Sequence, residues 1–219
     1  MKININMAFT LKQKKTEEIF NTLSHAAGIP IALAALTLLV VFAAINGTTW
    51  HIVSFSIFGI SMLLLYVAST LFHASRKIRV KYYLNKLDHS AIYVLIAGTY
   101  TPIALVNLQG TIGWILFGLI WGLALAGIIF KIWFYTQKYR KLSTWLYVAM
   151  GWLIVIAIVP LIQSTPWDAL LFLIAGGVCY TIGALFYLRK NKKLSHFIFH
   201  LFVLGGSICH FFCFLVLVI

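Results

Sequence analysis

Residues 21–45 read NTLSHAAGIPIALAALTLLVVFAAI and contain no Asp, Glu, Lys or Arg. A helix needs roughly 20 mostly apolar residues to cross the hydrocarbon core of a bilayer, so this stretch is long enough to span a membrane. The whole chain has the same character, because 62% of its 219 residues are hydrophobic and 10% are charged. A soluble globular domain has roughly 25% charged residues. We therefore predict an integral membrane protein.

Further apolar runs follow between short polar breaks, and each is long enough to form another span. The chain has room for about seven such helices and for no separate soluble domain. The predicted spans are residues 21–45, 52–73, 87–108, 112–134, 142–162, 169–188 and 194–218. We expect an all-α integral membrane protein with a seven-transmembrane helix bundle. Residues 1–20 would form a cytoplasmic N-terminal segment, and residues 21–219 would form one transmembrane domain.

The positions of the basic residues predict how this bundle lies in the membrane. Lys and Arg occur in the N-terminal segment and in the second, fourth and sixth loop regions, whereas the breaks around Gly47, Gly110 and Ser164 contain none. Short loops rich in Lys and Arg remain in the cytoplasm. All 17 Lys and Arg thus agree with a cytoplasmic N-terminus and an external C-terminus, with Lys131 assigned to the fourth loop region.

The net charge of +13 is divided among these four regions on one face of the membrane. Anionic lipid headgroups account for such a distribution. We therefore expect membrane lipids, and no nucleic acid, as partners of the chain.

Three histidines and one aspartate fall near the cytoplasmic ends of the predicted spans. His196 and His200 lie in the first turns of the seventh span, and their spacing of four places both imidazoles on one side of a helix, as in paired-His metal sites. His73 ends the second span and is the best third ligand for a catalytic-type zinc site with an open fourth position. Asp88 begins the third span, where it would orient or deprotonate a water.

Each of these residues also has a simpler interpretation. A histidine on an apolar helix is often a hydrogen-bonded packing residue, and Asp88 at a helix start is a suitable N-cap. The common depth of all four residues on three helices favours a metal site over four separate structural roles. Iron or manganese suits a His and carboxylate site, but three imidazoles in a dry cavity favour Zn²⁺.

Depth separates the remaining histidines from this site. His51 starts the second span on the outer side, and His210 lies about 15 Å beyond His200 along the last helix, so neither is expected to reach the metal. His89 points about 100° away from Asp88 around the helix, which favours an interfacial role.

Polar residues on the first two spans are candidates for supporting roles. Glu18, Asn21 and His25 recur at i, i+3 and i+7 on one helix face, where they would support the metal ligands, gate substrate access or simply form interhelical hydrogen bonds. Ser69 lies one turn before His73, so its hydroxyl could donate to a metal-bound water or to a developing oxyanion. An equally good interpretation is that Ser69 is a small residue that permits close helix contact.

Residues 98–102, Gly-Thr-Tyr-Thr-Pro, predict a kink in the third span, with threonine hydroxyls available to the carbonyl that the proline frees. This segment would shape the bundle without taking part in the chemistry.

Four motifs follow one another along nearly the whole chain. They are Glu18-x-x-Asn21-x-x-Ser24-His25-x-x-Gly28, Ser69-x-x-x-His73, Asp88-His89-Ser90-Ala91-Ile92-Tyr93 leading into Ala97-Gly98-Thr99-Tyr100-Thr101-Pro102, and His196-x-x-x-His200 with His210 following. Together they resemble the hemolysin III family, the bacterial branch of the progestin and adipoQ receptor (PAQR) group.

The resemblance implies a seven-helix bundle with a cytoplasmic N-terminus and a zinc ion held by His73, His196 and His200. It also implies that Asp88 contacts the zinc-bound water with Ser69 close by, as in the wider superfamily that includes alkaline ceramidases. The implied activity is hydrolysis of a lipid amide or ester, with a role in membrane-lipid homeostasis in the bacterial plasma membrane.

Three functions are compatible with these sequence features. A zinc-dependent intramembrane hydrolase would use Asp88 as a base and the apolar walls of the bundle to hold an acyl chain. A receptor-like regulatory protein would hold a structural zinc in a closed site, with Asp88 as a direct ligand. A pore-forming hemolysin, which the family name suggests, fits poorly because the charged residues gather at one end of the spans.

Overall fold

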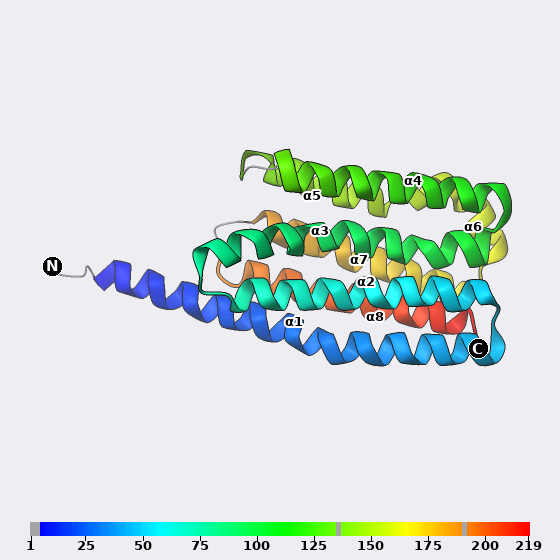
Figure 1. The fold of residues 1–219 in the computed structure, drawn as a ribbon, viewed down its shortest axis with the longest axis horizontal. Coiled ribbons are helices and arrows are strands. Elements are labelled where there is room, and N and C mark those ends of the chain that lie inside the picture. The colour runs from blue at the N-terminus through cyan, green and yellow to red at the C-terminus, as the bar shows by residue number, and fades with distance from the viewer. Residues whose placement is uncertain (1–4, 135–136, 190–191) are drawn as a thin grey trace.

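A computed structural model describes residues 5–134, 137–189 and 192–219, and this part of the chain contains helices and no strand (Figure 1). The α-helices are α1 (Ile5–Asn46), α2 (Thr49–Ala74), α3 (Ile78–Pro102), α4 (Gly110–Ile129), α5 (Arg140–Gly151), α6 (Ile158–Ser164), α7 (Trp167–Leu188) and α8 (Ser195–Val216). Short π-helical or 3₁₀ segments join or extend them, namely η1 (Ile103–Leu108), η2 (Phe130–Phe134), η3 (Gln137–Tyr139) and η4 (Leu153–Ala157).

Seven helical segments of the described chain are long and apolar enough to cross a membrane, as predicted. They are Lys15–Asn46, Thr49–Ala74, Ile78–Leu108, Gly110–Phe134, Arg140–Ser164, Trp167–Leu188 and Ser195–Val216. Successive spans run in opposite directions, so the start of α1 and the C-terminus lie at opposite ends of the bundle, and the first part of α1 projects beyond it (Figure 1).

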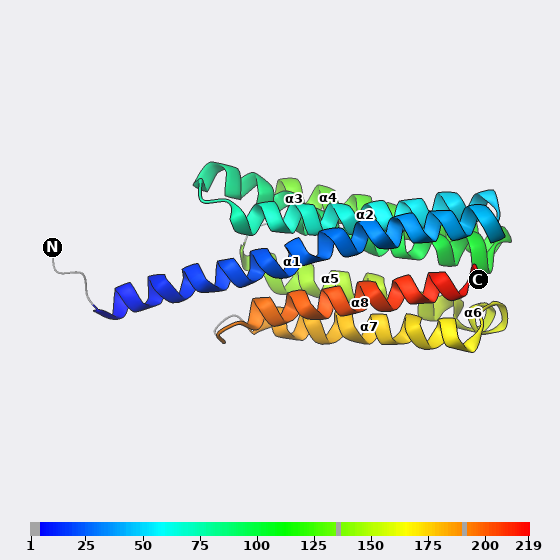
Figure 2. The same cartoon turned by 90° about the horizontal axis from the view of Figure 1, so that it is seen from below.

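The spans pack around a core made mainly by α1, α2, α3 and α8. Helix α1 lies along α2 and α8, α2 packs on α3, and α7 packs on α8 (Figure 2). Phe55, Phe58 and Met62 of α2 are buried in this core with Phe214 of α8. Small residues bring the helices close together, since Gly28 lies directly against the Tyr66 ring. Several polar side chains are buried within the bundle and so kept from lipid, among them Ser54 and Ser61 of α2 and Ser207 of α8.

The third span begins nine residues before its predicted start at residue 87, because α3 starts at Ile78. Only Ser75, Arg76 and Lys77 remain between α2 and α3. Hydropathy marks only the part of a helix that lies in hydrocarbon, whereas lysine and arginine are good helix formers that extend it into the headgroup region. The first turns of α3 therefore carry basic side chains that were expected in a loop.

Lys131 is a second correction to the predicted loops. It lies in the π-helical segment η2 and is 1% exposed, so it is a buried residue of the fourth span. In the described part of the chain, the other basic residues lie toward one end of the bundle. We call the end that carries Arg76, Lys81, Arg140 and Arg189 the basic end.

The Gly-Thr-Tyr-Thr-Pro segment changes the helix type in the third span. The chain turns from α-helix to π-helix at Ile103, directly after Pro102. Thr99 donates to the carbonyl of Leu95, and Thr101 donates to that of Ala97. These hydroxyls thus bond carbonyls other than that of Gly98, which Pro102 leaves without its helical donor.

Candidate metal centre

Three histidine side chains from two helices converge near the basic end. His73 is in the last turn of α2, and His196 and His200 are in the first turns of α8. Nε2 of His196 lies 3.2 Å from Nε2 of His73 and 3.1 Å from Nε2 of His200. Among the described residues these three form the one group of at least three His, Cys, Asp or Glu whose ligand atoms all lie within 4.8 Å of one another.

This spacing fits a tetrahedral zinc site. Zinc holds each imidazole nitrogen at about 2.0–2.1 Å, which places two ligand nitrogens about 3.3 Å apart. The ligand set is also suitable, because imidazole nitrogens bind zinc well and His200 is only 1% exposed. The three residues could therefore hold a metal ion, and their chemistry suits zinc.

Hydrogen bonds on the far side of the imidazoles orient two of these ligands. Nδ1 of His73 donates a hydrogen bond to Oε2 of Glu18 at 2.9 Å. The other carboxylate oxygen, Oε1, forms an ion pair with Nζ of Lys81 at 2.9 Å. A carboxylate partner fixes the proton on Nδ1 and leaves the Nε2 lone pair for a metal. Glu18 therefore links α1, α2 and α3 at the candidate metal centre.

His200 is oriented in the same way by the backbone of α1. Its Nδ1 lies 3.2 Å from the carbonyl oxygen of Asn21 and 3.0 Å from Oγ of Ser24. A carbonyl oxygen only accepts, so Nδ1 carries the proton and Nε2 is free to bind a metal. The His25 ring stacks on the His200 ring, with centroids 3.6 Å apart and an angle of 16° between the planes.

The structure thus places Glu18, Asn21 and His25 beside the candidate ligands. Asn21 makes its contact through the backbone carbonyl. Its side-chain Oδ1 and both ring nitrogens of His25 are buried without a hydrogen-bond partner in the described part of the protein. A role in supporting the metal or in gating stays a prediction for these residues.

Asp88 and Ser69 lie near the histidines without joining them. Oδ2 of Asp88 is 3.2 Å from Nδ1 of His89, and the Asp88 carboxylate is outside the group of converging ligand atoms. Ser69 is 1% exposed, and its hydroxyl lacks a hydrogen-bond partner among the described residues. Both residues line one cavity together with His196 and His200.

His89 is buried, so its predicted interfacial role is wrong. Its Nδ1 contacts Asp88 and lies 2.9 Å from the carbonyl oxygen of Asn85, and its Nε2 lies 3.1 Å from the Tyr187 hydroxyl. Both Nδ1 partners are acceptors, so Nδ1 is the donor and Nε2 accepts from Tyr187. Other helices cover α3 on several sides, so a residue that points away from Asp88 around the helix still points into protein.

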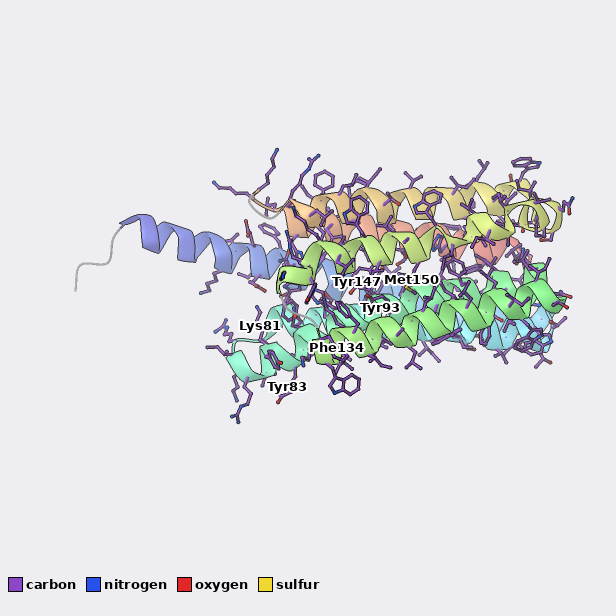
Figure 3. All side chains as sticks on the ribbon, turned by 90° about the horizontal axis from the view of Figure 1, so that it is seen from above. Lys81, Tyr83, Tyr93, Phe134, Tyr147 and Met150 are labelled. Atoms are coloured by element: carbon purple, nitrogen blue, oxygen red, sulfur yellow. The ribbon has the colours of Figure 1, made fainter. Side chains whose placement is uncertain are left out.

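Helix α5 is anchored on α3 close to the Asp88 carboxylate. Figure 3 shows Tyr93 of α3 and Tyr147 of α5 side by side, and their ring centroids are 4.5 Å apart. The Tyr147 hydroxyl also donates to the carbonyl of His89 at 3.0 Å. These tyrosines were absent from the predicted site. The signal in the sequence was that Tyr93 follows Asp88 by five residues, about one and a half turns of the same helix.

An apolar cavity of about 260 Å³ adjoins the metal centre. It extends from His25 and His200 to Trp167 and His210, and most of its lining is aliphatic or aromatic. Its volume is close to the lower limit of about 300 Å³ that is typical of ligand pockets. His210 thus lies on the same cavity as the metal centre, although, as predicted, it is not one of the converging histidines.

Comparisons with known proteins show the family of this chain. A family model described as "Haemolysin-III related" matches residues 13–211. The chain is 49% identical over 205 residues to the "Hemolysin-3 homolog" of Bacillus subtilis (strain 168), covering 94% of each chain. It is 47% identical over 197 residues to "Hemolysin-3" of Bacillus cereus, covering 90% of each chain. It is also 26% identical over 202 residues to the human "Monocyte to macrophage differentiation factor", covering 90% of this chain and 82% of the human protein.

Proposed function

This chain belongs to the haemolysin-III-related family, and we propose that it is a zinc-dependent intramembrane hydrolase acting on a lipid amide or ester. One observation carries the proposal: three Nε2 atoms converge, and two of these histidines line an apolar cavity that Asp88 and Ser69 also line. Three protein ligands with one free coordination position are typical of catalytic zinc sites.

The residues around the centre have complementary roles in this proposal. His73, His196 and His200 hold the zinc, which supplies a Lewis acid that acidifies water and polarises a carbonyl group. Asp88 accepts the proton of the attacking water. The Ser69 hydroxyl, which has no partner among the described residues, donates to the negative charge that develops on the carbonyl oxygen.

The position of Asp88 favours the hydrolase over a receptor-like protein with structural zinc. A closed structural site needs a fourth ligand from the protein. The Asp88 carboxylate instead contacts His89 and lies outside the group of converging nitrogens. A pore-forming function has less support, because the long cavity has apolar walls instead of a polar path for ions.

The surroundings of the centre agree with a lipid substrate. The cavity beside the histidines offers apolar walls for an acyl chain, and the bundle presents large apolar side chains to its surroundings. We infer that the protein resides in the bacterial plasma membrane with its basic end in the cytoplasm. There it would contribute to membrane-lipid homeostasis.

Metal analysis of the purified protein, paired with hydrolysis of labelled ceramide and labelled phospholipid, tests the proposal. We expect bound zinc in the wild type and its loss when His73, His196 and His200 are all changed to Ala. Asp88→Asn should keep the zinc and lower turnover by about 10²–10⁴-fold, the usual contribution of a general base. Zinc retained by the triple variant would refute the site, and unchanged turnover of Asp88→Asn would remove Asp88 as the base.

A further inference from the structure

A second, smaller cavity of about 150 Å³ lies at the basic end of the bundle. Its lining differs from that of the apolar cavity, because three basic side chains and one carboxylate contribute to it. These four are Arg140, Arg189, Lys192 and Glu17. We call it the basic cavity.

The basic cavity and the apolar cavity share two wall residues, Tyr187 and His196. His196 is a candidate metal ligand, and its Nε2 lies among the three converging nitrogens. A molecule bound in the basic cavity is therefore next to the metal centre. A lipid that extends past His196 would place its polar group and its acyl chain on different sides of this histidine.

Arg140 is held in place at this cavity before any ligand arrives. Its Nη1 donates to the carbonyl of Tyr187 at 2.9 Å and its Nη2 donates to that of Leu188 at 3.3 Å. The guanidinium carbon lies 5.3 Å from the centre of the Tyr187 ring. A guanidinium has five N–H donors in a planar fork, so these two bonds leave donors for a ligand. A fixed side chain also loses little conformational entropy on binding.

The charges around the cavity favour an anion. Arg140, Arg189 and Lys192 supply three positive charges against the single negative charge of Glu17. The Glu17 carboxylate already accepts a hydrogen bond from the backbone N–H of Leu194 at 3.3 Å. Arginine forks and lysine are the usual protein partners of phosphate oxygens.

We propose that the basic cavity binds the phosphate of a lipid headgroup, so that the hydrolase acts on a phosphate-bearing lipid whose acyl chain enters the apolar cavity. The claim that this lipid is a substrate rests on the proposed function, whereas its binding in the basic cavity requires no turnover. The basic end is also where phosphate headgroups lie when the spans cross a bilayer.

Binding to metal-free protein in detergent tests the proposal without depending on hydrolysis. The probes are lysophosphatidic acid and the monoacylglycerol with the same acyl chain, which differ by the phosphate. We expect the wild type to bind the phosphate-bearing lipid at least about 10-fold more tightly, because charge-assisted hydrogen bonds are the strong ones. The double variant Arg189→Gln/Lys192→Gln should lose most of this preference while its affinity for the monoacylglycerol stays the same.

The control variant Arg76→Gln/Lys77→Gln removes two charges from the same end of the bundle, at residues that line neither of the two cavities described here. It should keep the wild-type preference. An equal loss in this control would show attraction by surface charge alone and overturn the proposal. Arg140→Lys, which keeps the charge and removes the planar fork, should show a partial loss.

Inorganic phosphate distinguishes a headgroup from a free anion. It should compete only weakly with lysophosphatidic acid, because it lacks the acyl chain that the apolar cavity holds. If inorganic phosphate binds as tightly as the lipid, the site takes free phosphate and the proposal is wrong. If the preference for phosphate is present but no lipid is hydrolysed by the zinc-loaded protein, the hydrolase proposal fails while the basic cavity stands.

Discussion

Glu18 of α1 connects the candidate metal centre to α3 through a single carboxylate. Its two oxygens contact His73 and Lys81, each at 2.9 Å, although 41% of its side chain is exposed. Partners that orient a metal-bound histidine typically contribute 10–100-fold to metal affinity. The contact predicts an effect on zinc affinity that an ordinary surface carboxylate would not have.

We therefore expect Glu18→Gln to weaken zinc binding by about 10–100-fold, because an amide orients Nδ1 less strongly than a carboxylate. Competition with a chromophoric chelator measures the change. The matched control is Glu17→Gln, which removes the same charge from the neighbouring residue, whose carboxylate contacts the backbone of Leu194 instead of a histidine. Equal zinc affinity in wild type and Glu18→Gln would refute the orienting role.

Single residues also show what the sequence could predict about the site. The i, i+4 spacing of His196 and His200, together with the depth of His73 in the membrane, was enough to predict that these three histidines converge. The partners of His89 and the burial of Lys131 depend on which helices cover α3 and η2. That information lies in contacts between distant segments and not in the local pattern of either helix.

At the scale of helices, close packing between α2 and α3 supports the residues that carry the site. Gly98 of α3 faces Ser61 of α2, and a Cβ atom at position 98 would overlap the Ser61 side chain. Ser61 is buried and donates to the carbonyl of Phe58 at 2.7 Å, so it has little room to move. The two helices could approach less closely if this glycine were replaced.

Gly98→Ala should destabilise the bundle by about 1–3 kcal/mol, the usual cost of overpacking a well-packed contact. Thermal unfolding in detergent, followed by the loss of the monodisperse peak in size-exclusion chromatography, measures the effect. Gly118→Ala on α4 is the control, since a Cβ atom there meets nothing within 4 Å. Equal melting temperatures for the two variants would contradict the packing argument.

The boundaries of the helices were predicted less well than their number. Turns without charge, such as the one at Gly47, were placed correctly because polar residues there interrupt long apolar runs on both sides. The start of α3 was missed, since its first turns have basic side chains that a hydropathy pattern cannot separate from a loop. Backbone hydrogen bonds continue through the headgroup region even where the side chains are no longer apolar.

At the scale of the whole molecule, the separation of charge predicts the orientation in the membrane. The chain has 17 Lys and Arg against four Asp and Glu, and the turns between α1 and α2 and between η1 and α4 have none of them. Translocating several basic segments across a membrane is unfavourable, whereas the uncharged turns can cross it readily. The metal centre and the basic cavity would then both be accessible from the cytoplasm.

Two single-cysteine probes test this orientation, one at each end of the bundle. Thr48→Cys lies in the uncharged turn after α1, and Arg76→Cys lies in the basic link after α2; both positions are exposed. A membrane-impermeant maleimide should label Thr48→Cys in intact cells and label Arg76→Cys only after the cells are permeabilised. The unsubstituted protein is the control, because its three free cysteines lie within spans α7 and α8. The opposite pattern would place the metal centre on the outer side, where its phosphate-bearing ligands would have to come from the external leaflet.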